Sequence, residues 1–118
     1  MDKERYVEKA VKWAERKAVV SLKSISERYE SPKVFVRKTT QDEIQADLSF
    51  VTKVGVKHYS VVALKKENHK KTVPKWKVLS FLAYMKGGNL HLLVSNGHKS
   101  NTLKLVNKFN INAVIHML

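Results

Sequence analysis

A chain of 118 residues with 43% hydrophobic and 28% charged side chains has the composition of one folded domain, which excludes a disordered or collagen-like chain. It contains no cysteine, which excludes disulfides, thiolate catalysis and cysteine-ligated zinc. Lysine and arginine number 23 against 10 aspartate and glutamate residues, so the formal net charge is +13 and a polyanionic partner is favoured.

The first predicted element is a long amphipathic helix from Lys3 to Tyr29. Apolar residues recur through this segment at intervals of three and four, which is the spacing of one helix face. We expect the helix to end at Ser31-Pro32, because proline disfavours helical geometry in the residue before it and has no backbone N–H to donate.

After Pro32 the apolar residues alternate with polar ones, which is typical of β-strands. The pattern predicts three strands, over residues 33–38, 43–51 and 58–66. Gly55 lies between the last two and can adopt the positive φ that a tight reversal needs. We therefore expect an antiparallel meander of these three strands.

The second half of the chain alternates helices and strands. A helix that is apolar nearly all round is predicted to begin at Thr72-Val73-Pro74 and to end at Gly87-Gly88. A buried strand over 90–95, a short helix capped by Ser100 or Thr102 and a final strand over 111–117 follow it. Short strand-helix-strand connections imply a right-handed parallel crossover. The predicted order is α-β-β-β-α-β-α-β, a single α/β domain over residues 1–118 with a central mixed sheet.

Charge is distributed unevenly along the chain. No acidic side chain follows Glu67, whereas residues 68–118 contain eight lysines. Lysines that neutralise phosphates release condensed counterions, so nucleic acid is the expected partner, with DNA favoured over RNA. The alternative is a lysine-rich surface that only keeps the protein soluble. We expect no membrane association and a soluble, cytoplasmic protein, because the longest strongly apolar run, residues 78–85, is shorter than the ~20 residues of a bilayer span.

The segment from Glu67 to Lys77 is suited to contact with phosphates. Its lysines surround a tryptophan at the start of a predicted helix, where unpaired backbone amides favour anions. The tryptophan can stack on a base or anchor the helix to the sheet, and the sequence leaves both open. The expected nucleic-acid-binding residues are Lys66, Lys70, Lys71, Lys75, Trp76 and Lys77.

The element order, with the residues ADLSF on the second predicted strand and YSVVALKKE on the third, resembles the PD-(D/E)XK nuclease superfamily, which has the restriction-endonuclease-like fold. In that family an acidic residue on the second strand and an acidic-X-lysine triplet on the third meet at one edge of the sheet. The carboxylates hold one or two divalent cations, and the lysine orients or activates a water. The resemblance implies Asp47 as a metal-binding and catalytic aspartate and Lys65 as the catalytic lysine.

The second acidic position of the triplet holds Ala63, so the implied Mg or Mn site is incomplete. Glu67 lies on the same face of the predicted strand and is the candidate replacement metal ligand. In an extended strand, however, it is ~13 Å from position 63, too far to replace that ligand without a bend. Glu43 is as far from Asp47, and Glu8 and Glu15 fit a solvated helix face better. Asp47 and Lys65 also fit a simple cross-strand ion pair.

Three functions remain open at this point. The first is a nucleic-acid-binding protein with a degenerate metal site. The second is an active Mg- or Mn-dependent endonuclease with a displaced carboxylate, in a monomer or across a homodimer. The third is a structural or protein-interaction domain. The five histidines lack the paired spacing of a metal site, so we expect them in turns or at satisfied positions at the edge of the core.

Overall fold

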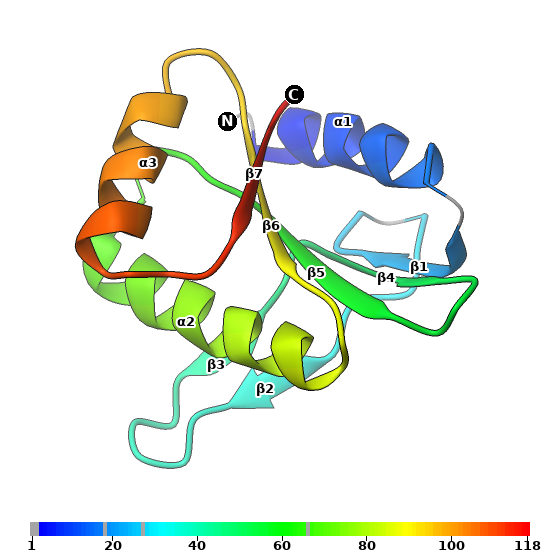
Figure 1. Cartoon of the computed structure of the whole chain (residues 1–118), viewed down its shortest axis with the longest axis horizontal. Coiled ribbons are helices and arrows are strands. Elements are labelled where there is room, and N and C mark those ends of the chain that lie inside the picture. The colour runs from blue at the N-terminus through cyan, green and yellow to red at the C-terminus, as the bar shows by residue number, and fades with distance from the viewer. Residues whose placement is uncertain (1–2, 18, 27, 66) are drawn as a thin grey trace.

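The computed structural model describes residues 3–17, 19–26, 28–65 and 67–118, which fold into three layers (Figure 1). A five-stranded mixed sheet forms the middle layer. Helix α1 (Lys3–Glu15) covers one face, and helices α2 (His69–Met85) and α3 (Lys99–Lys108) cover the other. The α/β class and the mixed sheet predicted from the sequence are thus confirmed.

The central sheet has the strand order β1-β4-β5-β6-β7. Strands β1, β4 and β5 are antiparallel neighbours, and β6 and β7 continue the sheet parallel to β5. The parallel crossovers from β5 to β6 and from β6 to β7 contain α2 and α3. The strands are β1 (Val19–Ser24), β4 (Leu48–Thr52), β5 (Lys57–Val62), β6 (Leu90–Val94) and β7 (Val114–Met117).

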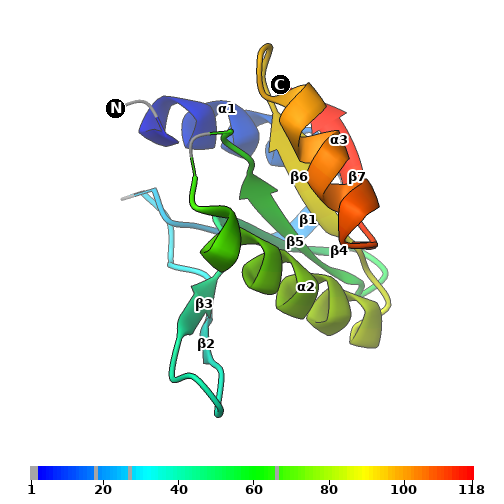
Figure 2. The ribbon, with the colours of Figure 1, turned by 90° about the vertical axis from the view of Figure 1, so that its left-hand side faces the viewer.

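Two short strands, β2 (Val34–Val36) and β3 (Glu43–Gln45), form a separate antiparallel hairpin. The hairpin projects from the sheet beside the N-terminal end of α2 (Figure 2). Its inward residue Ile44 is buried with the α2 side of the core, which anchors the hairpin to the domain.

Side chains alternate along the strands and so divide the core into two clusters. On β5, Tyr59 and Val61 pack with Trp76 and Leu79 on the α2 side. Val62 belongs to the other cluster, beneath α1. This alternation decides which polar groups of the strands lie under α1.

The predicted helix over Lys3–Tyr29 is wrong beyond Glu15, because residues 19–24 form the edge strand β1. Residues 7, 11 and 14 of α1 are buried on its sheet-facing side, as the pattern predicts. After them, the β-branched pair Val19-Val20 favours a strand. Pairing of Leu22 with Phe50 then satisfies the backbone of β4, which a longer helix would leave unpaired.

The predicted strands also change at their ends. The segment 43–51 is broken at Ala46-Asp47, so that β3 and β4 belong to different sheets. The strand predicted over 58–66 ends at Val62. The predicted antiparallel meander is therefore wrong in its first strand: residues 33–38 lie outside the central sheet, and β4 pairs instead with β1, which precedes the hairpin in the chain.

The turn predicted at Gly55 is confirmed, whereas α2 and α3 both begin earlier than predicted; the N-cap residue of α3 is His98 and not Ser100 or Thr102. Gly55 has a φ of 85° in the turn between β4 and β5. Helix α2 begins earlier than predicted, at His69, because the side chain of Asn68 accepts the N–H of Lys70 and caps the first turn. Among the described residues, no helix combines the length and the apolarity needed to cross a membrane.

Candidate functional site

Asp47 lies in the bend just before β4, on the α1 side of the sheet. Its backbone N–H donates to the carbonyl of Ser60 and its own carbonyl accepts the N–H of Ile25, both at 3.0 Å. Its carboxylate Oδ2 accepts the N–H of Val62 at 2.8 Å. The residue is 3% exposed, so two hydrogen bonds fix its backbone and one holds its buried carboxylate in one orientation.

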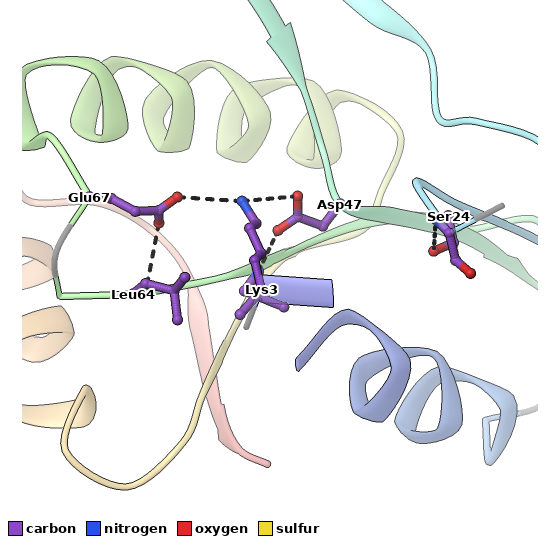
Figure 3. Close-up of polar contacts among 7 residues, drawn as sticks. Lys3, Ser24, Asp47, Leu64 and Glu67 are labelled. Carbon is purple, nitrogen blue, oxygen red and sulfur yellow. Dashed lines mark hydrogen bonds and ion pairs between the residues drawn. The ribbon is translucent and has the colours of Figure 1, made fainter. Parts of the chain in front are cut away.

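Glu67 is brought to the same place by a turn that follows β5. The N–H of Glu67 donates to the carbonyl of Leu64, and the N–H of Leu64 donates to Glu67 Oε1 at 3.3 Å. These bonds fold the carboxylate back toward the end of the sheet, as Figure 3 shows. An extended strand would have kept Glu67 far from this site, and the turn brings its carboxylate back.

Lys3, in the first turn of α1, lies between the two carboxylates (Figure 3). Its Nζ is 3.4 Å from Asp47 Oδ1 and 3.4 Å from Glu67 Oε2, so these two oxygens are at most twice that distance apart. Burial lowers the pKa of Lys3, but the charges of Asp47 and Glu67 together outweigh it and raise the pKa above its ordinary value. Lys3 is therefore held as an ammonium ion.

Lys75, on α2, is a second amine whose charge is coupled to this group. Burial lowers its pKa, and the nearby charge of Lys3 acts in the same direction. The carboxylates of Asp47 and Glu67 oppose the shift without cancelling it. Two amines and two carboxylates thus gather where α1, the start of β4 and α2 meet.

Lys65, the lysine implied as catalytic, lies apart from these groups. It is exposed in the turn after β5, and its backbone N–H donates to His98 Nδ1 at 3.0 Å. Within the described parts of the chain its amine forms no ion pair, so the cross-strand pair with Asp47 is absent and Lys3 takes that place. The sequence pattern missed Lys3, because the residue is distant in sequence and lies on a helix face that reads as solvated.

A groove of about 420 Å³ runs from Glu67 between the β2–β3 hairpin and the first turns of α2. Basic side chains of α2 form one wall, and two acidic side chains and one arginine of the hairpin form the other. Its charged lining residues are Arg37, Asp42, Glu43, Glu67, Lys70, Lys71 and Lys75. Lys77 is exposed further along α2, and Lys66 lies outside the described residues.

Trp76 requires a correction. It is 2% exposed and packs in the core with Leu79 and Val61, so its ring is not available to stack on a base. The alternative reading of the sequence, a tryptophan that anchors the helix to the sheet, is the one found. Lys75 and Lys77 flank it, but a residue at this position of α2 faces the sheet.

A second polar group, which the spacing of histidines does not reveal, lies under the other end of α1. His58, His91 and His116 stand on the neighbouring strands β5, β6 and β7. His91 Nε2 is 3.0 Å from His58 Nδ1, and His91 Nδ1 is 3.0 Å from His116 Nε2. Trp13 of α1 covers the group, with its ring centroid 4.9 Å from that of His116.

The backbone fixes the direction of these hydrogen bonds. The N–H of Asn89 donates to His58 Nδ1, which therefore carries no proton. His91 must then donate from Nε2 to His58 and accept at Nδ1 from His116 Nε2. His58 and His91, which each use one ring nitrogen as an acceptor, are neutral in this arrangement.

Burial keeps the histidines neutral. It lowers the pKa of His91 to about 3, and the charge of Lys17, or of either neighbouring ring when that ring is protonated, acts in the same direction. Burial also lowers the pKa of His58 and of His116, and Lys17 adds to both effects. His91 is 7% exposed, which accounts for the largest shift among the three.

The carboxylate pair does not fit a divalent cation while Lys3 is in place. One oxygen of each carboxylate accepts a backbone N–H, the other faces the ammonium, and Ala63 supplies no side-chain ligand. In the part of the chain that the structure describes, no three histidine, aspartate or glutamate side chains are arranged to hold a metal ion.

Comparison with known proteins found no family model, no curated protein and no solved structure that matches the chain.

Proposed function

We propose that this protein binds nucleic acid through the layer formed by α2 and α3, by contacts to the phosphate backbone that do not depend on sequence. The observation that carries the proposal is the charge of this layer. Helices α2 and α3 together carry seven lysines and no carboxylate. On the other face of the sheet, α1 carries four basic and three acidic residues.

The positions of these lysines support the proposal. Both helices lie on the same face of the sheet, so their charges add on one side of the molecule (Figure 1). Six of the seven are exposed, and they are Lys70, Lys71, Lys77, Lys99, Lys104 and Lys108. Among the described residues none of these six lysines forms an ion pair, so they are available to phosphates, and each neutralised phosphate releases counterions.

The resemblance to the PD-(D/E)XK superfamily enters as part of the proposal. Its support is the order of the elements, with α1 before an antiparallel β1-β4-β5 unit and α2 leading to a parallel β6. The β2–β3 hairpin is then an insertion. In this reading the ancestral metal site has become the group in which Lys3 joins Asp47 and Glu67.

The experiment measures affinity against salt by fluorescence anisotropy with labelled DNA and RNA, single-stranded and duplex. We expect log K to fall linearly with log salt concentration, with a slope of about −0.9 per phosphate contacted on duplex DNA. The triple variant Lys70→Ala/Lys71→Ala/Lys77→Ala should flatten this slope by about 2 to 3.

A matched control removes the same charge from the other layer. The variant Arg5→Ala/Lys9→Ala/Lys12→Ala changes three exposed basic residues of α1 and should leave the slope nearly unchanged. Equal effects of the two triple variants, or affinity that does not respond to salt, would contradict the proposal.

The alternative of an active nuclease has one observation in its favour, which is that Glu67 does reach Asp47 through Lys3. It predicts cleavage of DNA or RNA with Mg or Mn that is lost in both Asp47→Ala and Lys65→Ala. Cleavage that survives both substitutions would belong to a contaminant, and wild-type protein without cleavage under these conditions would remove this alternative.

A further inference from the structure

The exposed face of α2 changes character along its length. Lys70, Lys77, Phe81 and Tyr84 are separated by seven, four and three residues, so they lie on one side of the helix. This set, the α2 stripe, is basic at its N-terminal end and aromatic at its C-terminal end. It spans about 21 Å at 1.5 Å per residue.

The aromatic end of the stripe is open to solvent although the rings are large. Phe81 is 62% exposed and Tyr84 is 72% exposed. Neither belongs to the core clusters, whereas their helix neighbours Leu79 and Ala83 are fully buried beneath α2. Packing of the domain therefore does not account for two aromatic rings at these positions.

The rings line a groove of about 590 Å³ between α2 and the segment that connects α3 to β7. The connecting segment follows α2 in Figure 1, and Ser80 Oγ donates to the carbonyl of Asn112 at 2.5 Å. Besides Phe81 and Tyr84, the groove is lined by an ammonium, a third aromatic ring and side-chain amides. These residues are Lys77, Phe109, Asn110 and Asn112.

Positive charge surrounds the groove. The amines of Lys77 and Lys108 lie 5.7 Å and 5.4 Å from the ring centroid of Phe109. No carboxylate side chain occurs in residues 68–118, which include both walls. Charge complementarity therefore favours an anionic occupant over a second copy of this chain, whose net charge is also +13.

We infer that the aromatic end of the α2 stripe stacks on unpaired bases, while its lysines follow the phosphates of the same strand, so that the protein selects single-stranded nucleic acid over duplex. The inference rests on the proposed function and specifies its substrate class. Aromatic rings beside lysines bind successive bases through their π faces, and bases inside a duplex are not accessible to such rings.

The test uses three labelled ligands: a thymidine oligonucleotide, an abasic strand of the same length and the corresponding duplex. The abasic strand keeps every phosphate and lacks the bases. We expect the wild-type protein to bind the thymidine strand at least about tenfold more tightly than the abasic strand, because each stacked base contributes several-fold in affinity.

Two double variants separate stacking from apolar contact. Phe81→Ala/Tyr84→Ala and Phe81→Leu/Tyr84→Leu should both bind the thymidine strand only as tightly as the abasic one, since leucine keeps apolar surface but has no π face. The control Val20→Ala/Val54→Ala removes two exposed apolar residues elsewhere and should leave binding unchanged. Lys70→Ala/Lys71→Ala should weaken binding of both strands by the same factor.

The outcomes distinguish this inference from the proposed function. A wild-type protein that binds no strand in a salt-dependent way overturns both. Salt-dependent binding with equal affinity for thymidine and abasic strands overturns the stacking inference alone. Binding to vesicles of phosphatidylserine that is lost in the alanine variant and kept in the leucine variant, with oligonucleotide binding unaffected, assigns the rings to a lipid surface and also overturns it.

Discussion

Two polar clusters lie at the two ends of α1. Burial of polar groups is unfavourable, and the two clusters offset it in different ways. At the first, Lys3 neutralises Asp47 and Glu67, so the groups stay charged and paired. At the second, three histidines under Trp13 stay uncharged and bond to one another. One helix thus covers an ionic group and a neutral one on the same sheet.

This difference predicts which perturbation destabilises each cluster. Removing one ion of a buried pair leaves the other without a partner, which costs far more than the pair contributes. A chain of neutral imidazoles contains no buried ion pair to break, but its central ring, His91, is 7% exposed and cannot accept a proton without burying a charge. The first cluster should therefore respond to mutation and the second to pH.

The largest expected effect is that of Asp47→Ala. It removes a buried carboxylate that pairs with Lys3 and accepts the N–H of Val62, so we expect a loss of about 3 kcal/mol in the free energy of unfolding. Urea denaturation followed by circular dichroism measures it. Glu30→Ala, which breaks the exposed Lys23–Glu30 pair at 3.1 Å, should cost less than about 1 kcal/mol.

Similar losses in Asp47→Ala and Glu30→Ala would contradict the ionic half of the comparison. A second variant, Asp47→Asn, keeps the shape of the side chain and an oxygen for the Val62 N–H while it removes the charge. Its loss should fall between the other two, since only the partner of Lys3 is missing.

The next effect is the pH dependence of stability caused by His91. Its pKa is about 3 in the folded protein, against an ordinary value of 6.5, so the unfolded state binds more protons between these values. Stability is fully present above pH 6.5 and falls toward pH 3, by roughly 1.4 kcal/mol per pH unit. We expect about 2 kcal/mol to be lost on going to about pH 5.

Urea denaturation at several pH values tests this, with His91→Leu as the variant. Leucine cannot bind a proton, so the variant should lose less stability than the wild-type protein over the same pH range. His69→Gln, at an exposed position of α2, is the control and should keep the wild-type slope. A His91→Leu curve parallel to the wild-type curve would show that the buried ring is not the cause.

The fold was predicted best from the sequence in those segments whose hydrophobic pattern is compatible with only one type of secondary structure. The buried strand at 90–94, the helices on either side of it and the parallel crossover follow from long apolar runs between turn signals. The segment after Glu15 was mistaken because apolar intervals of three and four also fit a half-buried edge strand. Residues 19–24 form a strand because they pair with β4, and such a tertiary contact cannot be read from the local pattern.

The two clusters also differ in how far they could be predicted from the sequence. Asp47 and Glu67 were candidates from a motif, yet the cation between them comes from Lys3, 44 residues before Asp47 in the chain. The histidines gave no local signal, since their proximity depends on the register of three strands. Side chains that meet through sheet topology can be identified from one sequence only when the topology is known.

The smallest effect concerns Lys17, whose charge adds to burial in lowering the pKa of all three histidines. Its amine lies 4.6 Å from the ring centroid of Trp13, so Lys17→Gln removes a cation–π contact worth about 0.5 kcal/mol and a repulsion that grows as the histidines gain protons. The variant should therefore be slightly less stable than the wild-type protein at neutral pH, and this deficit should shrink on acidification.

NMR titration of the imidazole signals of Lys17→Gln should show the pKa of His58, His91 and His116 rising together. Lys12→Gln removes one charge from an exposed position of α1 and should move none of them. Equal responses to the two variants would mean that net charge, rather than the amine over Trp13, sets the protonation of the cluster.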